Sequence, residues 1–507
     1  MEVNMEVNME KELYAVYEAI DALVDYAEAR LELAELDTDW VRNQIFALFA
    51  LNSYPSAGIS NAARKVSEIA PERPDTLLAA FTEACIAANL FAQEEADSRC
   101  DQVMGILTRT PSQISARFSD ISQSSGTQAM EWFYNYCVAN NYVRRSVLDR
   151  NPRFNANGLI ITINKAKPEF KDPKKAAAGN SVSGGYPKCS ICHENEGFAG
   201  RTKYTLRTVP LQLAGEKWFW QFSPYGYLAC HGIAINSQHT PMHVDRKTFT
   251  KLMDFVDQYP DFFIGCNAAL ARIGGSVLGH DHYQAGGEAL PMQRAGAWKT
   301  LQDQNFPDAI VEILDWHNTA IRVVSKNRNA IEEISDKIRQ AWVVYNNPDF
   351  GIKSGNGSEH FSAVSPTVIR TERGYEMSLI LRSNITSAEF PEGVFHAHPE
   401  YFPIKQESIG LIEAQGLFVL PGRLDWQLAQ IADALAAGTE LPADLSEFEL
   451  VWNELREMLG DETDRSAAES AIRKELGSIC ERILENTAVF KDKETTVEFL
   501  SSIGIEA

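Results

Sequence analysis

The segment best suited to chemistry contains two histidines and a glutamine at alternate positions, within Gly274-Gly-Ser-Val-Leu-Gly-His280-Asp-His282-Tyr-Gln284. In an extended strand, residues two apart face the same side, so these three side chains project together. The preceding glycines let the backbone approach a ligand closely and present amide groups to phosphate oxygens. A neutral imidazole is nucleophilic near pH 7 and can pass a bound phosphoryl group on. The pattern predicts phosphoryl chemistry through a histidine; a metal site using both histidines, or a buried hydrogen-bonded pair, is the alternative.

A second pattern is the pair Cys189 and Cys192, the only closely spaced cysteines among the eight of the chain. Redox pairs usually stand at the N-terminus of a helix in a βαβ unit, whereas this pair follows a Gly-Gly-Tyr-Pro turn. Zinc is therefore the better interpretation, and a redox pair is the alternative. Tetrahedral zinc needs two more ligands, and the candidates in the same block are His231, His239, His243 and His280.

Composition limits the possible partners. The chain has 507 residues and a net charge of −22, which argues against a nucleic-acid partner because phosphate backbones require a basic surface. The first residues are acidic and lack an apolar stretch behind them, so we expect no signal peptide. No run of about 18 apolar residues suggests a membrane span. The sequence predicts a soluble cytoplasmic protein.

Four regions are expected along the chain: a helical part over 1–150, mixed α/β blocks over 151–304 and 305–423, and an acidic helical part over 424–507. In the first mixed block we expect strands at 158–164, 218–222 and 228–235 and a helix at 246–258. In the second we expect a helix at 308–340 and strands at 341–345, 363–370 and 376–384. Each mixed block carries a His-x-His, at 280/282 and 396/398, which suggests duplicated halves.

Together these stretches resemble the galactose-1-phosphate uridylyltransferases of the histidine-triad superfamily, in the long form typical of Gram-positive bacteria. The resemblance covers roughly residues 180–425. The matching stretches, in order, are Tyr186 to Gly197, Gln238 to Met242, Gly265-Cys-Asn267, Gly274 to Gln284, and His396 to Gly422.

The resemblance implies a fold and a set of site residues. The fold would be α+β, with two related antiparallel half-barrel halves between helical ends. His282 would be the nucleophile and Gln284 would bind the phosphoryl oxygens. Substrate-binding positions are further implied at Asn267, Gly275, Ser276 and His398. The implied zinc ligands are Cys189, Cys192, His239 and His280.

The resemblance also implies the reaction, a ping-pong exchange of UMP between UDP-glucose and galactose 1-phosphate by a homodimer. Hydrolases of the superfamily carry a third histidine where this chain has Gln284, and an amide has no proton to exchange near pH 7, so transfer is favoured over hydrolysis. The short class of the family has His-Pro-His-Gly-Gln; here Asp281 and Tyr283 differ, but both face away from the nucleophile. The alternatives are another superfamily nucleotidyltransferase, such as a dinucleoside polyphosphate phosphorylase, and a zinc-stabilised nucleotide sensor.

Overall fold

The computed structural model describes residues 2–54, 71–165, 185–273, 277–460, 462 and 464–507. The predicted substrate-binding residues Gly275 and Ser276 lie outside the described residues. By its packing the chain divides into a smaller unit (residues 1–146, 191–210 and 219–224) and a larger unit (147–190, 211–218 and 225–507). Among the helices that the structure describes, none is long and apolar enough to cross a membrane.

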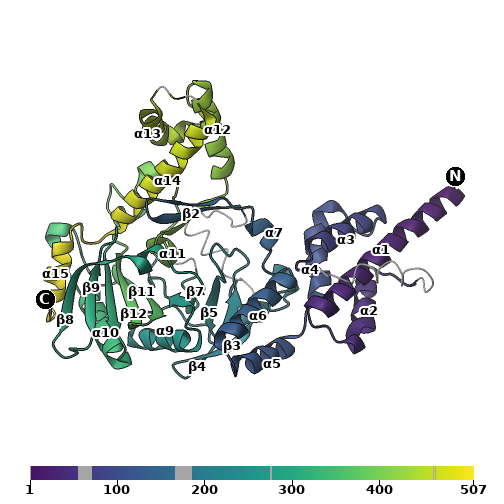
Figure 1. Ribbon diagram of the computed structural model, residues 1–507, viewed down its shortest axis with the longest axis horizontal. Helices are drawn as coiled ribbons and strands as arrows, with labels where there is room; N and C mark the ends of the chain where they lie inside the picture. The colour runs from purple at the N-terminus through teal and green to yellow at the C-terminus, as the bar shows by residue number, and fades with distance from the viewer. Residues whose placement is uncertain (1, 55–70, 166–184, 274–276, 461, 463) are drawn as a thin grey trace. The chain divides into compact units, whose positions relative to one another are not determined.

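The smaller unit consists mainly of helices, coloured purple to blue in Figure 1. They are α1 (Glu2–Arg30), α2 (Thr38–Leu48), α3 (Asp75–Ala87), α4 (Ala96–Leu107), α5 (Pro111–Ser122) and α6 (Gly126–Ala139), followed by the short α7 (Arg145–Leu148). Their starts follow from the sequence: Pro111 occupies the first turn of α5, and the Ser125 hydroxyl accepts a hydrogen bond from the Gln128 amide at the start of α6. Buried Phe81 and Phe133 belong to the core of this unit.

An open sheet of eleven strands dominates the rest of the fold, in the order β14-β8-β9-β10-β12-β11-β6-β7-β5-β4-β3. Its strands are β3 (Val209–Leu213), β4 (Glu216–Phe222), β5 (Gly232–Asn236), β6 (Phe263–Gly265), β7 (His282–Gly286), β8 (Ala297–Asp303), β9 (Ile310–Leu314), β10 (Ala320–Ser325), β11 (Ser362–Thr371), β12 (Gly374–Ser383) and β14 (Ile505–Glu506). From β14 to β5 every neighbouring pair is antiparallel. The predicted α+β class with antiparallel sheet is therefore confirmed, but the sheet is not a closed barrel.

The strand order repeats within this sheet. Strands β3 to β7 are arranged as β3-β4-β5-β7-β6, and strands β8 to β12 as β8-β9-β10-β12-β11. Helix α9 (Arg246–Gln258) connects β5 to β6, and α10 (Arg328–Val343) connects β10 to β11 at the same point of the repeat. In this repeat β12 of the second half occupies the position that β7 occupies in the first half. The motif His280/His282 lies at the start of β7, whereas His396 and His398 come after the end of β12. The sheet therefore contains a repeat, but the two His-x-His motifs do not occupy equivalent positions in it.

The sequence expectation was wrong for residues 308–345. The predicted helix over 308–340 is instead the strands β9 and β10 followed by α10, and α10 extends to Val343, into the strand predicted at 341–345. The β-branched residues of β9 and β10 pack between neighbouring strands, where such side chains fit best. Trp342 lies in the α10 portion of that predicted strand; it is fully buried, and its indole N–H donates to the carbonyls of Ala363 and Arg382. Packing against the sheet thus keeps this stretch helical.

Two helices, α9 and α10, pack on strands β6, β10, β11 and β12. The start of α9 is fixed by a reciprocal cap between Asp245 and Thr248. The short α11 (Leu411–Ala414) approaches the sheet at β6. A Cβ on Gly265 would lie 2.7 Å from both Leu411 Cδ2 and the Pro366 carbonyl oxygen, so only glycine fits there.

A small sheet and the last helices complete the larger unit. The sheet joins β1 (Arg153–Ala156), β2 (Leu159–Asn164) and β13 (Leu417–Pro421), and β13 runs parallel to β2. The helices are α12 (Leu424–Ala437), α13 (Glu449–Leu459), α14 (Arg465–Thr487) and α15 (Lys493–Ser501). A Cβ on Gly477 of α14 would lie 2.6 Å from the Ala156 side chain, so this helix and β1 are in close contact.

Candidate active site and metal centre

The His-x-His-x-Gln segment enters the sheet at its second histidine. His282 opens β7 opposite Ile235 of β5, and Gln284 lies between Ile233 of β5 and Gly265 of β6. The extended conformation that the spacing predicted is therefore present from His282 onward. Because His282 and Gln284 are two residues apart in one strand, they share a face of the sheet.

The environment of His282 defines its protonation and tautomer. The side chain is buried, and its Nδ1 lies 2.8 Å from the carbonyl oxygen of His280, to which it donates. Burial lowers the pKa of His282 to about 4, so the ring is neutral near pH 7. With the proton held on Nδ1, the lone pair of Nε2 is available for attack.

Gln284 and His231 lie close together on this side of the sheet. Burial lowers the pKa of His231 to about 4, and the adjacent Gln284 side chain opposes that shift. The Tyr227 ring covers His231 with a centroid distance of 4.4 Å. His231 is therefore a neutral neighbour of the amide rather than a metal ligand. Spacing alone left it among four zinc candidates and could not have placed it here.

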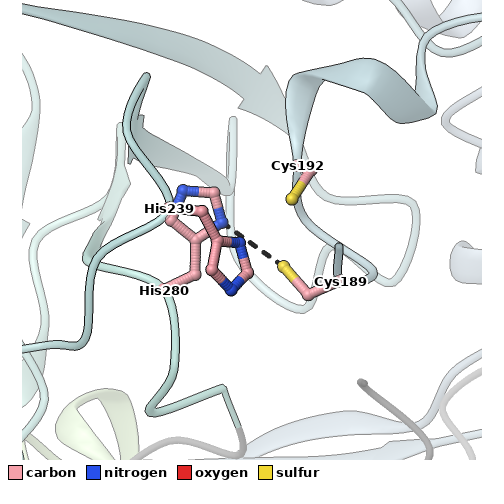
Figure 2. A group of neighbouring side chains, drawn as sticks. All are labelled: Cys189, Cys192, His239 and His280. Carbon is pink, nitrogen blue, oxygen red and sulfur yellow. Dashed lines mark hydrogen bonds between the residues drawn. The ribbon is translucent and has the colours of Figure 1, made fainter. Parts of the chain in front are cut away.

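The two cysteines and two histidines of the predicted zinc site come together (Figure 2). One potential ligand atom from each of Cys189, Cys192, His239 and His280 lies within 4.8 Å of the others, and all but the half-buried His239 are buried. Cys189 Sγ lies 3.3 Å from His280 Nδ1. Zinc–sulfur and zinc–nitrogen bonds at a tetrahedral angle would separate these two atoms by about 3.6 Å. The donor set and its spacing fit a metal ion.

The other nitrogen of His280 has a separate partner. His280 Nε2 donates to the carbonyl oxygen of Asn236 at 2.8 Å, so Nδ1 keeps a lone pair directed at Cys189. Metal-bound histidines in proteins are oriented in this way by a hydrogen bond from the second ring nitrogen. By contrast His243, another candidate from the sequence, is exposed and lies 3.6 Å from Asp245.

Asp281 and Tyr283 occupy the opposite side of the segment. Tyr283 stacks on Trp218 with a centroid distance of 4.6 Å, and Lys251 of α9 lies over the same indole. The buried Lys251 ammonium is 3.0 Å from Glu216 and 3.8 Å from Asp281. Burial raises the pKa of Asp281, and Lys251 opposes that effect. These residues anchor the segment to α9 and leave the His282 side free for a substrate.

Asn267 lies just beyond β6, two residues after Gly265, whose register partner in β7 is Gln284. Its Oδ1 accepts a hydrogen bond of 2.8 Å from the Leu411 amide. Its buried Nδ2 has no hydrogen-bond partner among the described residues, so two N–H donors remain for a ligand.

The second half of the chain reaches the site through residues 409–411. Arg382 of β12 donates to the Ile409 carbonyl at 2.9 Å, and its Nε and Nη1 have no hydrogen-bond partner within the described part of the chain. Burial lowers the pKa of Arg382 to about 10, so it stays cationic near pH 7 and can bind a phosphate oxygen. The sequence interpretation missed this arginine, because burial of a strand arginine leaves no local signal.

His396 and His398 follow β12 in an irregular segment. His396 is buried and its Nδ1 lies 2.9 Å from the Ala397 carbonyl oxygen, whereas His398 is half-buried and stacks on Phe390 at a centroid distance of 4.1 Å. Arg382 and Lys405 add to the burial that lowers the pKa of His396 to about 4. His396 therefore lies near the Arg382 and Lys405 cations, and the pair does not form a metal cluster among the described residues.

Comparison with known proteins shows the family of this chain. The family model described as the N-terminal domain of galactose-1-phosphate uridyl transferase matches residues 34–241. A galactose-1-phosphate uridylyltransferase of Bifidobacterium longum subsp. longum is 58% identical over 514 residues, covering 98% of this chain and 100% of the relative. Proteins of the same name from Fusobacterium nucleatum and Bacillus subtilis are each 32% identical, covering 96% and 97% of this chain and 98% of each relative. No solved structure matches the chain. Because relatives that are 32% to 58% identical are matched over nearly their whole length, the chain belongs to the galactose-1-phosphate uridylyltransferase family.

Proposed function

We propose that the chain exchanges UMP between UDP-glucose and galactose 1-phosphate through a uridylyl group carried on His282. The observation that carries the proposal is the neutral, buried His282 ring, whose Nδ1–H is held by the His280 carbonyl. That hydrogen bond leaves Nε2 as the nucleophilic atom. A covalent intermediate on histidine divides one difficult transfer into two easier displacements.

The two displacements balance in bonds and charge. In the first, His282 Nε2 attacks the α-phosphorus of UDP-glucose, and the bond from that phosphorus to the oxygen of glucose 1-phosphate breaks. In the second, a phosphate oxygen of galactose 1-phosphate attacks the same phosphorus, and the P–N bond returns its electron pair to Nε2. Gln284 would hold the non-bridging oxygens through its amide N–H groups, and it cannot protonate a leaving group. The intermediate therefore waits for a phosphate acceptor.

Asn267 and His398 would bind substrate on either side of His282, together with Gly275 and Ser276 outside the described residues. Support for Asn267 comes from its two buried N–H donors, which have no hydrogen-bond partner among the described residues. Support for the hexose phosphate near His398 comes from the buried cation of Arg382, which affects the neighbouring His396. A dianionic sugar phosphate needs such a cation in a site shielded from water.

Zinc is the metal that we propose for Cys189, Cys192, His239 and His280. Two thiolates and two imidazoles are typical of structural zinc. When bound, the ion would supply rigidity and no step of the transfer. His280 would then position the backbone carbonyl that holds the His282 proton, so the metal site and the nucleophile would be coupled through one residue.

We also propose that the two mixed blocks, 151–304 and 305–423, are related halves of histidine-triad type between the helical regions 1–150 and 424–507. The repeated strand order of β3 to β7 and β8 to β12 supports this proposal. A homodimer is the expectation for this family, and sedimentation velocity would check it.

The experiment is a quench with UDP-glucose in the absence of an acceptor. We expect release of glucose 1-phosphate and UMP on the peptide that contains His282, in an acid-labile and alkali-stable bond. His282→Ala should abolish the adduct and reduce turnover by roughly 10⁴- to 10⁶-fold. His282→Gly should recover part of the first half-reaction when free imidazole is added. The exposed His243→Gln is the matched control and should form the adduct normally. Label on another histidine, or normal exchange by His282→Ala, would refute the assignment.

A further inference from the structure

A cavity of about 660 Å³ lies in the larger unit, between the β9–β10 connection and the end of α14. Its walls come from residues 313–320 and 485–496. None of the residues proposed above for transfer or for zinc belongs to either stretch. The cavity therefore shares no lining residue with the proposed transfer site or the proposed zinc site.

Three metal-ligating side chains meet at the rim of this cavity. Ligand atoms of His317, Glu481 and Glu485 all lie within 4.8 Å of one another, and His317 Nδ1 is 3.6 Å from Glu481 Oε1. His317 and Glu485 also line the cavity. One imidazole and two carboxylates are a donor set suited to a divalent ion such as Mn²⁺ or Zn²⁺.

One of the carboxylates is already oriented. Asn157 Nδ2 donates to Glu481 Oε2 at 3.0 Å, which leaves Oε1 on the side of His317. Ligating carboxylates are commonly held in place by such an outer hydrogen bond. Asn157 itself is fixed at the turn between β1 and β2, where it has a positive φ of 50°.

The position of the carboxylates on α14 is unfavourable without a cation. Glu481 and Glu485 are four residues apart on one face of the helix, where like charges repel. They lie near its C-terminal end, where the helix dipole disfavours negative charge, and the last turn contains no basic residue. Lys491 attracts the Glu485 carboxylate electrostatically, but its hydrogen bonds go to the main-chain carbonyls of Glu485 and Asn486 at the helix end and not to either carboxylate.

Asn318, another polar residue that lines the cavity, has an unsatisfied acceptor. Asn318 is only 5% exposed and lines the cavity beside His317. Its Nδ2 donates to the Ala414 carbonyl at 2.9 Å, while its buried Oδ1 has no hydrogen-bond partner among the residues that the structure describes. A buried acceptor of this kind costs stability unless a ligand or a bound water donates to it.

We propose that His317, Glu481 and Glu485 bind one divalent cation at the rim of this cavity. Three protein ligands leave coordination positions open, and a metal-bound water in the cavity could donate to Asn318 Oδ1. This site is independent of the proposed zinc site, because its donors are hard oxygen and nitrogen atoms and it contains no thiolate.

Manganese distinguishes the two sites, since Mn²⁺ prefers oxygen ligands and competes poorly for thiolates. Zinc-loaded protein would be titrated with Mn²⁺, and the free ion followed by electron paramagnetic resonance. We expect saturable binding of one Mn²⁺ per chain with the zinc content unchanged. Glu485→Gln, on an exposed side chain that folding does not require, should weaken binding more than about tenfold, and Asn157→Ala should weaken it about tenfold.

The control is Glu469→Gln, which removes an exposed carboxylate from the same helix outside this cluster and should bind Mn²⁺ like the parent. Thermal unfolding would verify that each variant is folded. His317→Ala should lose the binding if it remains folded. Absence of saturable Mn²⁺ binding, or equal affinity in the parent, Glu485→Gln and His317→Ala, would overturn the proposal without affecting the transferase assignment.

Discussion

Acidification should destabilise this protein through histidines that are buried in the neutral form, among them His231 and His396. His231 and His396 are each only 4% exposed, and burial lowers the pKa of each to about 4. In the unfolded chain both should titrate near the ordinary value of about 6.5. Between these two values the unfolded state binds a proton that the folded state does not. Stability therefore falls as the pH is lowered from about 6.5 toward 4, and it is retained above 6.5.

The magnitude follows from the two pKa values. Between pH 7 and pH 5, a histidine whose pKa changes from about 6.5 unfolded to about 4 folded costs on the order of 2 kcal/mol. The pair together should remove about 4 kcal/mol, a large part of the 5–15 kcal/mol that typically separates folded from unfolded domains. The effect should thus be visible well before general acid denaturation.

Urea unfolding at pH 7, 6 and 5 would measure this cost in the parent and in the variants His231→Phe and His396→Asn. In each variant the fall in unfolding free energy between pH 7 and pH 5 should be about 2 kcal/mol smaller than in the parent, whatever the variant's stability at pH 7. Other groups that titrate in this range contribute equally to parent and variants and cancel in the comparison. His360→Asn, at an exposed histidine, is the control and should keep the full dependence. An unchanged slope in both buried-site variants would refute the reasoning.

Three further outcomes follow from the site. Lys251→Met should destabilise the fold by about 3 kcal/mol in urea unfolding, because it leaves the buried Asp281 uncompensated, and adding Asp281→Asn should restore part of the loss; no recovery would contradict the pairing. Cys189→Ser should lower the metal content measured by mass spectrometry and the melting temperature together, and a metal-free variant of full stability would contradict a structural zinc. Asn267→Asp keeps the acceptor for the Leu411 amide but loses both N–H donors, so kcat/KM should fall about 10²-fold with little change in melting temperature, whereas a loss of folding alone would contradict substrate binding.

The parts that could be predicted from sequence are those defined by local spacing. The strand at His282 and Gln284 and the Cys-x-x-Cys pair each depend on residues close in the chain. The strand is found from His282 onward, with His280 just before it and facing the two cysteines, and both cysteines lie in the expected cluster. The resemblance implied His239 rather than His231 or His243, and the structure places His239 in the cluster.

The parts that could not be predicted depend on packing between distant segments. The prediction of a helix over 308–340 was wrong because the first half of this stretch forms β9 and β10, which pair with β8 and β12. The spacing of apolar residues within the stretch does not show that distant strands will pair with it. Arg382 was not among the predicted site residues, since its contact with Ile409 joins it to a segment 27 residues away. The cluster of His317, Glu481 and Glu485 likewise joins residues more than 160 positions apart in the sequence.

One strand explains how this chain combines an altered motif with the family chemistry. Successive residues of a strand face opposite sides, so the segment divides its roles residue by residue. His282 and Gln284 face one side, while Asp281 and Tyr283 contact Lys251 and Trp218 on the other. His280 connects two features, because its ring faces the Cys/His cluster and its main-chain carbonyl accepts the His282 proton. Substitutions at 281 and 283 therefore change only the contacts with Lys251 and Trp218, whereas a substitution at 280 removes a ring from the cluster and affects His282 only by moving that carbonyl.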